Sequence, residues 1–175
     1  MSRRFPSGRL VRLAAVWVAL VCAIPLASAE QLAQPKGRIV LTISGGIGQP
    51  NRGKEAVFDA AMIEALPQHS FTTRTPWHAH PVKFTGPLLS DLLAATKAQG
   101  TTIVATAIND YAIQIPVADA ALHGVVVARL LDDKPMAVRD KGPLFVIYPF
   151  DSKPELRSSA YYERAIWQLK RMNIQ

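Results

Sequence analysis

The stretch that most constrains the fold is residues 102–116, which read T-I-V-A-T-A-I-N-D-Y-A-I-Q-I-P. Side chains alternate with a period of two on each side of the pair Asn109-Asp110. The positions that would share one face are Ile103, Ala105 and Ala107 before the pair, and Tyr111, Ile113 and Ile115 after it. Because successive side chains of a strand point to opposite faces, this pattern predicts a β-hairpin with one buried face. Pro116 ends the second strand, since proline has no backbone N–H. The polar tip is interpreted either as part of a binding site or as plain turn chemistry.

The first 29 residues are typical of a secretory signal peptide. Four arginines precede an apolar run over 13–24, and Ala27-Ser28-Ala29 forms a small-residue cleavage site. The apolar run is too short to span a bilayer, so we expect cleavage rather than an uncleaved anchor. The sequence therefore predicts a periplasmic or secreted protein without stable membrane insertion. We expect a flexible leader at 30–37 and a single domain at 38–175; the export route stays open.

Removal of the signal leaves 146 of the 175 residues, enough for one domain with its own core. The only cysteine, Cys22, leaves with the signal, which excludes disulfides, thiolate metal sites and cysteine nucleophiles from the mature chain. Four of the 20 Lys and Arg also leave, whereas all 13 Asp and Glu remain, so the net charge falls from +7 to +3. The chain has no basic run interleaved with aromatic residues, so nothing in it indicates nucleic acid as a partner.

Strands dominate the rest of the mature chain. We expect two main helices, one over 57–66 and one that opens at Pro87 and ends near Gly100, with a further helical turn over 117–123. The glycine-rich segment 45–48 is interpreted as a turn, because its spacing does not match a phosphate-binding loop. Further strands are predicted at 38–44, 68–75, 82–86, 125–131 and 144–148. The expected class is one α+β domain on a mixed or antiparallel sheet.

Two patterns bear on metal and nucleophilic chemistry. His78 and His80 share a proline-bounded loop, but a third ligand would have to come from elsewhere, so no metal site is expected. The chain also has no G-x-S-x-G segment, which disfavours a serine nucleophile.

A third pattern indicates an anionic ligand. Cationic and aromatic side chains recur along the chain, and such groups together suit an anionic, partly planar molecule. The residues are Arg74, Lys83, Arg139 and Lys141, with Trp77 and Tyr148. The alternative is scattered surface charge, which Asp140 between two of these cations favours.

Four blocks of sequence carry a resemblance to a known family. They are F-T-G-P-L-L-S-D-L-L (84–93), A-I-N-D-Y-A-I-Q-I-P (107–116), V-R-D-K-G-P-L-F-V-I-Y-P (138–149) and A-I-W-Q-L-K-R-M (165–172). In this order they resemble the oxidoreductase molybdopterin-binding domain of the sulfite oxidase family, most nearly its small exported single-domain members. The resemblance spans 38–174 and implies a mixed, strand-rich, sulfite-oxidase-like α+β fold.

The resemblance also exposes a missing ligand. In enzymes of that family, a cysteine thiolate after the early helix binds molybdenum. The corresponding interval here, 68–84, has Thr72, Thr73 and Thr75 but no cysteine. A hydroxyl is a harder ligand with a much higher pKa than a thiol, so molybdenum–cysteine redox chemistry is not expected.

Two main functions remain. The first is an exported, non-catalytic domain that binds a small anionic or pterin-like ligand, or a protein partner such as a membrane signalling protein. The second is a molybdopterin-dependent oxidoreductase, served by a redox partner, that holds its cofactor without a protein thiolate. A purely structural subunit is a third. The expected binding residues are Arg74, Trp77, His78, Asn109, Asp110, Tyr111 and Arg139. Tyr161, Tyr162 and Trp167 are interpreted as core, with an interface role as the alternative.

Overall fold

A computed structural model describes residues 32–175, so the predicted signal peptide lies outside the described residues. The described chain is rich in strands and has four short α-helices, which confirms the predicted α+β class. Within residues 32–175, no helix is long and apolar enough to cross a membrane.

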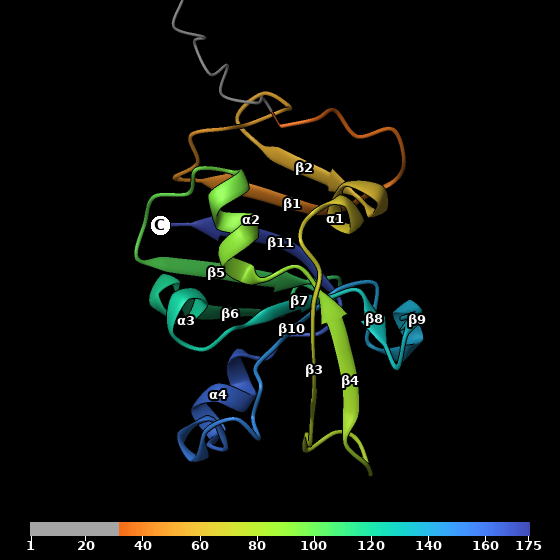
Figure 1. The fold of residues 1–175 in the computed structure, drawn as a ribbon. Helices are drawn as coiled ribbons and strands as arrows, with labels where there is room; N and C mark the ends of the chain where they lie inside the picture. The colour runs from red at the N-terminus through yellow and green to blue at the C-terminus, as the bar shows by residue number, and fades with distance from the viewer. Residues whose placement is uncertain (1–31) are drawn as a thin grey trace, which may run out of the picture.

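The main sheet has five strands in the order β2-β1-β11-β5-β6, and α2 lies across one of its faces (Figure 1). These strands are β1 (Ile39–Gly45), β2 (Ala56–Asp59), β5 (Thr102–Ala107), β6 (Ala112–Pro116) and β11 (Leu169–Ile174). The pair β1 and β11 is parallel, whereas the other pairs are antiparallel, so the sheet is mixed. The last strand of the chain is thus central and ties both halves of the sheet together.

The predicted hairpin is confirmed as β5 and β6, with Thr102 opposite Pro116. Ile103, Ala105 and Ala107 all face the core, as the period-two pattern requires. The second strand begins at Ala112, however, so Tyr111 belongs to the turn rather than to the strand.

A second group of strands packs beside the main sheet. It comprises a sheet in the order β3-β4-β8-β9 and the antiparallel pair β7 and β10. The bounds are β3 (His69–Thr73), β4 (Val82–Gly86), β7 (Val126–Ala128), β8 (Leu130–Leu131), β9 (Lys134–Pro135) and β10 (Phe145–Ile147). The segment predicted as one strand over 125–131 is therefore divided at Arg129. Gly86 is required where β4 meets β7, because an added Cβ would lie 2.1 Å from the Val127 carbonyl oxygen.

The helices are shorter than the sequence predicts. They are α1 (Ala60–Ala65), α2 (Leu89–Ala95), α3 (Val117–Leu122) and α4 (Ser159–Arg164), with 3-10 turns η1 (Val138–Asp140) and η2 (Pro154–Leu156). The prediction of a helix over 57–66 is wrong for its first turn, since Val57 and Phe58 pair with β1. Strand pairing and full burial outweigh the helical pattern there. The helix predicted from Pro87 towards Gly100 ends at Ala95.

Asp59 joins the segment ahead of β1 to the start of α1. One carboxylate oxygen accepts the Met62 N–H at 2.9 Å, and the other accepts the N–H groups of Lys36 and Gly37 at 2.7 Å each. These bonds, that from Met62 foremost, hold the pKa of the Asp59 carboxyl below its usual range. Part of the predicted leader over 30–37 is thus hydrogen bonded to the domain.

Candidate functional site

The candidate site is a cavity of about 430 Å³ whose walls are mainly aromatic. It is lined by Trp77, Ala107, Asn109, Tyr111, Tyr162, Glu163, Ala165, Ile166 and Trp167. These residues come from three places: the loop between β3 and β4, the β5–β6 turn, and α4 with the segment that follows it. A cavity of this size matches the lower range of small-molecule sites.

Trp77 forms the centre of the aromatic wall. Its ring centroid lies 5.4 Å from that of Trp167 and 6.1 Å from that of Tyr162, both in edge-to-face geometry. Behind it lie Phe145 and Phe150, at 5.9 and 6.2 Å. Because Phe145 and Phe150 are fully buried, the tryptophan ring has a rigid support.

The β5–β6 turn supplies the polar part of the wall. Asn109 Oδ1 accepts the Tyr111 N–H at 3.2 Å, which is the turn chemistry expected from the sequence. Asp110 has a φ of 64° and its carboxylate accepts a hydrogen bond from Lys170 Nζ at 2.8 Å. This bond from Lys170 holds the pKa of Asp110 below its usual range. Asp110 thus fastens the tip of the turn to β11 and leaves Asn109 and Tyr111 to line the cavity.

The segment after α4 runs along β10, which places Trp167. The Val146 N–H donates to the Ile166 carbonyl, and the Leu169 N–H donates to the Leu144 carbonyl, both at 2.9 Å. Trp167 is 36% exposed at the rim of the cavity. It is therefore held by backbone pairing while one part of its ring stays accessible.

A buried polar cluster holds α4 in place. Asp119 of α3 is 5% exposed, and one of its carboxylate oxygens accepts hydrogen bonds from Tyr148 Oη at 2.7 Å and from Arg164 Nη1 at 2.9 Å. Burial, together with the Asp119 carboxylate, raises the pKa of the Tyr148 phenol, so it remains a donor. Since α4 also carries Tyr162 and Glu163, the Asp119 cluster fixes one wall of the cavity.

A second contact reinforces this arrangement. Tyr161 Oη lies 3.1 Å from His123 Nε2, and the Arg164 guanidinium stands 5.0 Å from the Tyr161 ring centre. Tyr161 therefore faces α3, whereas its neighbour Tyr162 faces the cavity.

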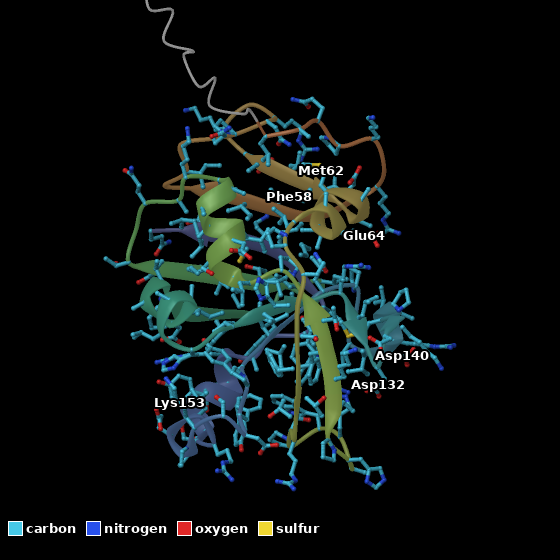
Figure 2. The ribbon with its side chains drawn as sticks, viewed as in Figure 1. Phe58, Met62, Glu64, Asp132, Asp140 and Lys153 are labelled. Carbon is cyan, nitrogen blue, oxygen red and sulfur yellow. The ribbon has the colours of Figure 1, made fainter. Side chains whose placement is uncertain are left out.

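Three of the seven predicted binding residues, Trp77, Asn109 and Tyr111, line the cavity. Arg74 does not: it lies at the end of β3, where its guanidinium is 3.8 Å from the Asp151 carboxylate. Arg139 is also outside, 88% exposed in its side chain and paired with Asp140 at 3.4 Å. Asp140 lies beside β9, on the side of the molecule away from Lys153 and α4 (Figure 2).

Two predicted binding residues remain: Asp110, which is absent from the cavity lining and pairs with Lys170, and His78, which lies behind the aromatic wall. Its Nδ1 is 2.7 Å from the Thr75 hydroxyl, and its ring packs edge-to-face on Phe84 at 6.0 Å. Burial, and then the nearby charge of Lys141, lower the pKa of His78.

Lys141 is the one member of the predicted cationic set that approaches the cavity. Its ammonium lies 5.8 Å from the centre of the Trp167 ring, a cation–π distance. Lys83 is paired with Asp133 at 2.8 Å. The cations that were predicted to form one anion-binding site are thus separated in the structure.

Two of the three threonines of the segment 72–75 are occupied by internal hydrogen bonds. The Thr73 hydroxyl accepts the Asp151 N–H at 3.0 Å, and Thr73 is 1% exposed. The Thr75 hydroxyl bonds His78 and accepts the Trp77 N–H at 3.2 Å. In the described part of the chain, no group of three His, Cys, Asp or Glu side chains is arranged to hold a metal ion.

Sequence reasoning missed Glu163 and the cavity-lining role of Tyr162 and Trp167. The run S-S-A-Y-Y-E-R-A-I-W at 158–167 was the available signal, since it places aromatic and charged side chains next to one another. The interpretation of Trp167 as core is wrong, because about a third of its surface is exposed.

The cavity is suited to holding a flat ring. Aromatic walls stack on planar ligands, the Glu163 carboxylate accepts hydrogen bonds, and the Asn109 amide can donate them. Within residues 32–175, neither Glu163 nor the Asn109 amide nitrogen has a protein partner in the hydrogen bonds of the structure. Both groups are therefore free to bind a ligand.

No protein-family model matches this chain, and no curated protein matches it.

Proposed function

We propose that this protein is an exported, non-catalytic domain that binds a pterin-like ring in the aromatic cavity. The observation that carries the proposal is the set of four aromatic side chains, from Trp77, Tyr111, Tyr162 and Trp167, around a cavity with one carboxylate. A bicyclic heteroaromatic ring offers two flat faces for such walls.

The polar groups favour a ring with donors on one edge. Pterin carries an amino group beside an imino N–H, and two parallel donors suit one carboxylate, as in bidentate pairing. Glu163 would accept both, and the Asn109 amide would donate to an acceptor of the ring. The resemblance to the sulfite oxidase family, whose cofactor contains a pterin ring, suggests this class of ring.

The cavity lining is a poor match for molybdopterin itself. That cofactor carries phosphate and dithiolene charge, whereas the charged side chain lining the cavity is the carboxylate of Glu163. Residues 32–175 also contain no cysteine. These features favour an uncharged pterin over the alternative of an oxidoreductase that holds molybdopterin without a thiolate. A sensing role towards a membrane signalling protein would suit such a domain.

The test is a titration of the protein with a soluble pterin, in which binding is measured by calorimetry and by tryptophan fluorescence. Both tryptophans of residues 32–175 line the cavity, so their emission should be quenched on binding. Trp167→Ala should weaken binding about 5- to 150-fold, because stacking on an aromatic side chain contributes about 1–3 kcal/mol.

Leu122→Ala is the matched control. It removes another large exposed apolar side chain, one 62% exposed at the end of α3 and outside the cavity lining. Binding should be unchanged in this variant. Absence of binding by the unaltered protein, or equal loss in both variants, would contradict the proposal.

A further inference from the structure

A second hollow lies on the other side of the β5–β6 turn and is independent of the proposed function. It is a groove of about 350 Å³ with an aliphatic floor. Its lining residues are Arg38, Ile39, Val40, Thr42, Ile108, Val138, Pro143, Leu169 and Lys170. We refer to it as the aliphatic groove.

The charge of this groove is positive. Arg38 and Lys170 line it, and no acidic residue does. In residues 32–175, no carboxylate pairs with Arg38. Lys170 is paired with Asp110 at 2.8 Å. Arg38 is thus a cation without a carboxylate partner in the described residues, at the edge of an apolar surface, with the paired Lys170 beside the groove.

The apolar side chains of the groove are exposed to an unusual degree. Ile108 is 42% and Val138 is 48% exposed, and both belong to the small set of large hydrophobic side chains that the described chain leaves open to solvent. Leu169 lies fully buried beneath them. An exposed apolar patch that is rimmed by polar residues marks a ligand or interaction site, and Arg38 stands at the rim of this one.

We propose that the aliphatic groove binds a small amphipathic carboxylate, of the class of medium-chain fatty acids. The alkyl chain would lie on Ile108 and Val138, and the carboxylate would bind the Arg38 guanidinium with Lys170 nearby. The volume favours a small molecule over a protein segment, and the charge selects an acid over a neutral lipid.

The test compares decanoate with decanol, which shares the alkyl chain but has no charge. Calorimetric titration of the protein produced from the full chain, below the concentration at which decanoate forms micelles, should show binding of decanoate at least tenfold tighter than of decanol. Arg38→Gln should remove most of this preference, since charge-assisted pairing would be lost. Added salt should weaken decanoate binding by the unaltered protein.

Two variants locate the site. Ile108→Ser should weaken both probes, whereas Trp167→Ala in the aromatic cavity should weaken neither. Equal affinity for acid and alcohol, no effect of Arg38→Gln, or loss in Trp167→Ala but not in Ile108→Ser would overturn the proposal. The pterin titration measures binding in the aromatic cavity, whereas the decanoate titration measures binding in the aliphatic groove. Each proposal can therefore fail without affecting the test of the other.

Discussion

The two hollows beside the β5–β6 turn have opposite chemistry although neighbouring residues build them. Ala107, Asn109 and Tyr111 line the aromatic cavity with Glu163, whereas Ile108 lines the aliphatic groove with its two cations. Ile108, Asn109 and Tyr111 all belong to the turn between β5 and β6, which presents Ile108 to one hollow and the other two to the second. One hairpin can therefore supply two surfaces with different ligand preferences.

The two hollows also differ in their support. One wall of the aromatic cavity rests on α4, which the buried Asp119 cluster holds against α3. The groove rests on β1 and β11, adjacent strands of the main sheet. A change in the polar cluster should therefore affect the cavity and spare the groove.

The largest expected effect is that of Asp119→Ala. It would leave the Tyr148 hydroxyl and the Arg164 guanidinium without their shared acceptor, at a cost of about 3 kcal/mol in the free energy of unfolding. Pterin binding should weaken because Tyr162 and Glu163 lose their support, whereas decanoate binding should persist. Chemical denaturation and the two titrations measure these effects.

Tyr148→Phe is the milder companion, since Asp119 keeps its bond from Arg164. A loss of about 1 kcal/mol is expected. If Asp119→Ala weakened both ligands equally, the two hollows would not be separately supported.

The next effect concerns the choice of ligand in the aromatic cavity. Lumazine replaces the pterin amino donor by a carbonyl, whose oxygen would face the Glu163 carboxylate. We expect pterin to bind at least about tenfold more tightly than lumazine, because an unpaired or repelled polar group costs more than 1 kcal/mol. Glu163→Gln should reduce this preference, since the amide can donate as well as accept.

The control for Glu163→Gln is Glu64→Gln, in an exposed carboxylate of α1 that pairs with Arg129 outside the cavity. An unchanged ratio of pterin to lumazine affinity in Glu163→Gln would show that Glu163 does not contact the ring edge.

The smallest expected effect is a dependence of the protein's stability on pH that comes from His78, which lies behind the aromatic wall of the cavity. The pKa of His78 is lowered in the folded protein, so the unfolded chain binds a proton more readily. Stability should therefore fall as pH drops through about 6.5, the ordinary histidine pKa, and level off below the folded pKa. Melting temperatures at about pH 7.5 and 5.5 should differ less in His78→Gln than in the unaltered protein, if His78 contributes as its environment predicts.

Local patterns predicted the parts of the fold that are decided locally. The β5–β6 hairpin follows from alternation and a turn, and the buried leucines of α2 follow from helical spacing. The segment 57–59 was misassigned because its strand conformation depends on pairing with β1. Fold class was within reach, whereas the bounds of elements set by tertiary contacts were not.

The site could be predicted only in part, because tertiary contacts also decide which residues come together there. Trp77, Asn109 and Tyr111 stand in loops and turns, where polar and aromatic residues attract notice. Glu163 joins them through contacts between segments far apart in the sequence. Arg139 was misleading, although the neighbouring Asp140 already indicated local pairing.

The most direct test of the central claim is pterin and molybdenum analysis of the protein, produced from its full chain in a host able to make molybdopterin. We expect a pterin close to one per chain, without molybdenum, and its loss in Trp167→Ala. Molybdenum close to one atom per chain would contradict the account and favour the oxidoreductase instead.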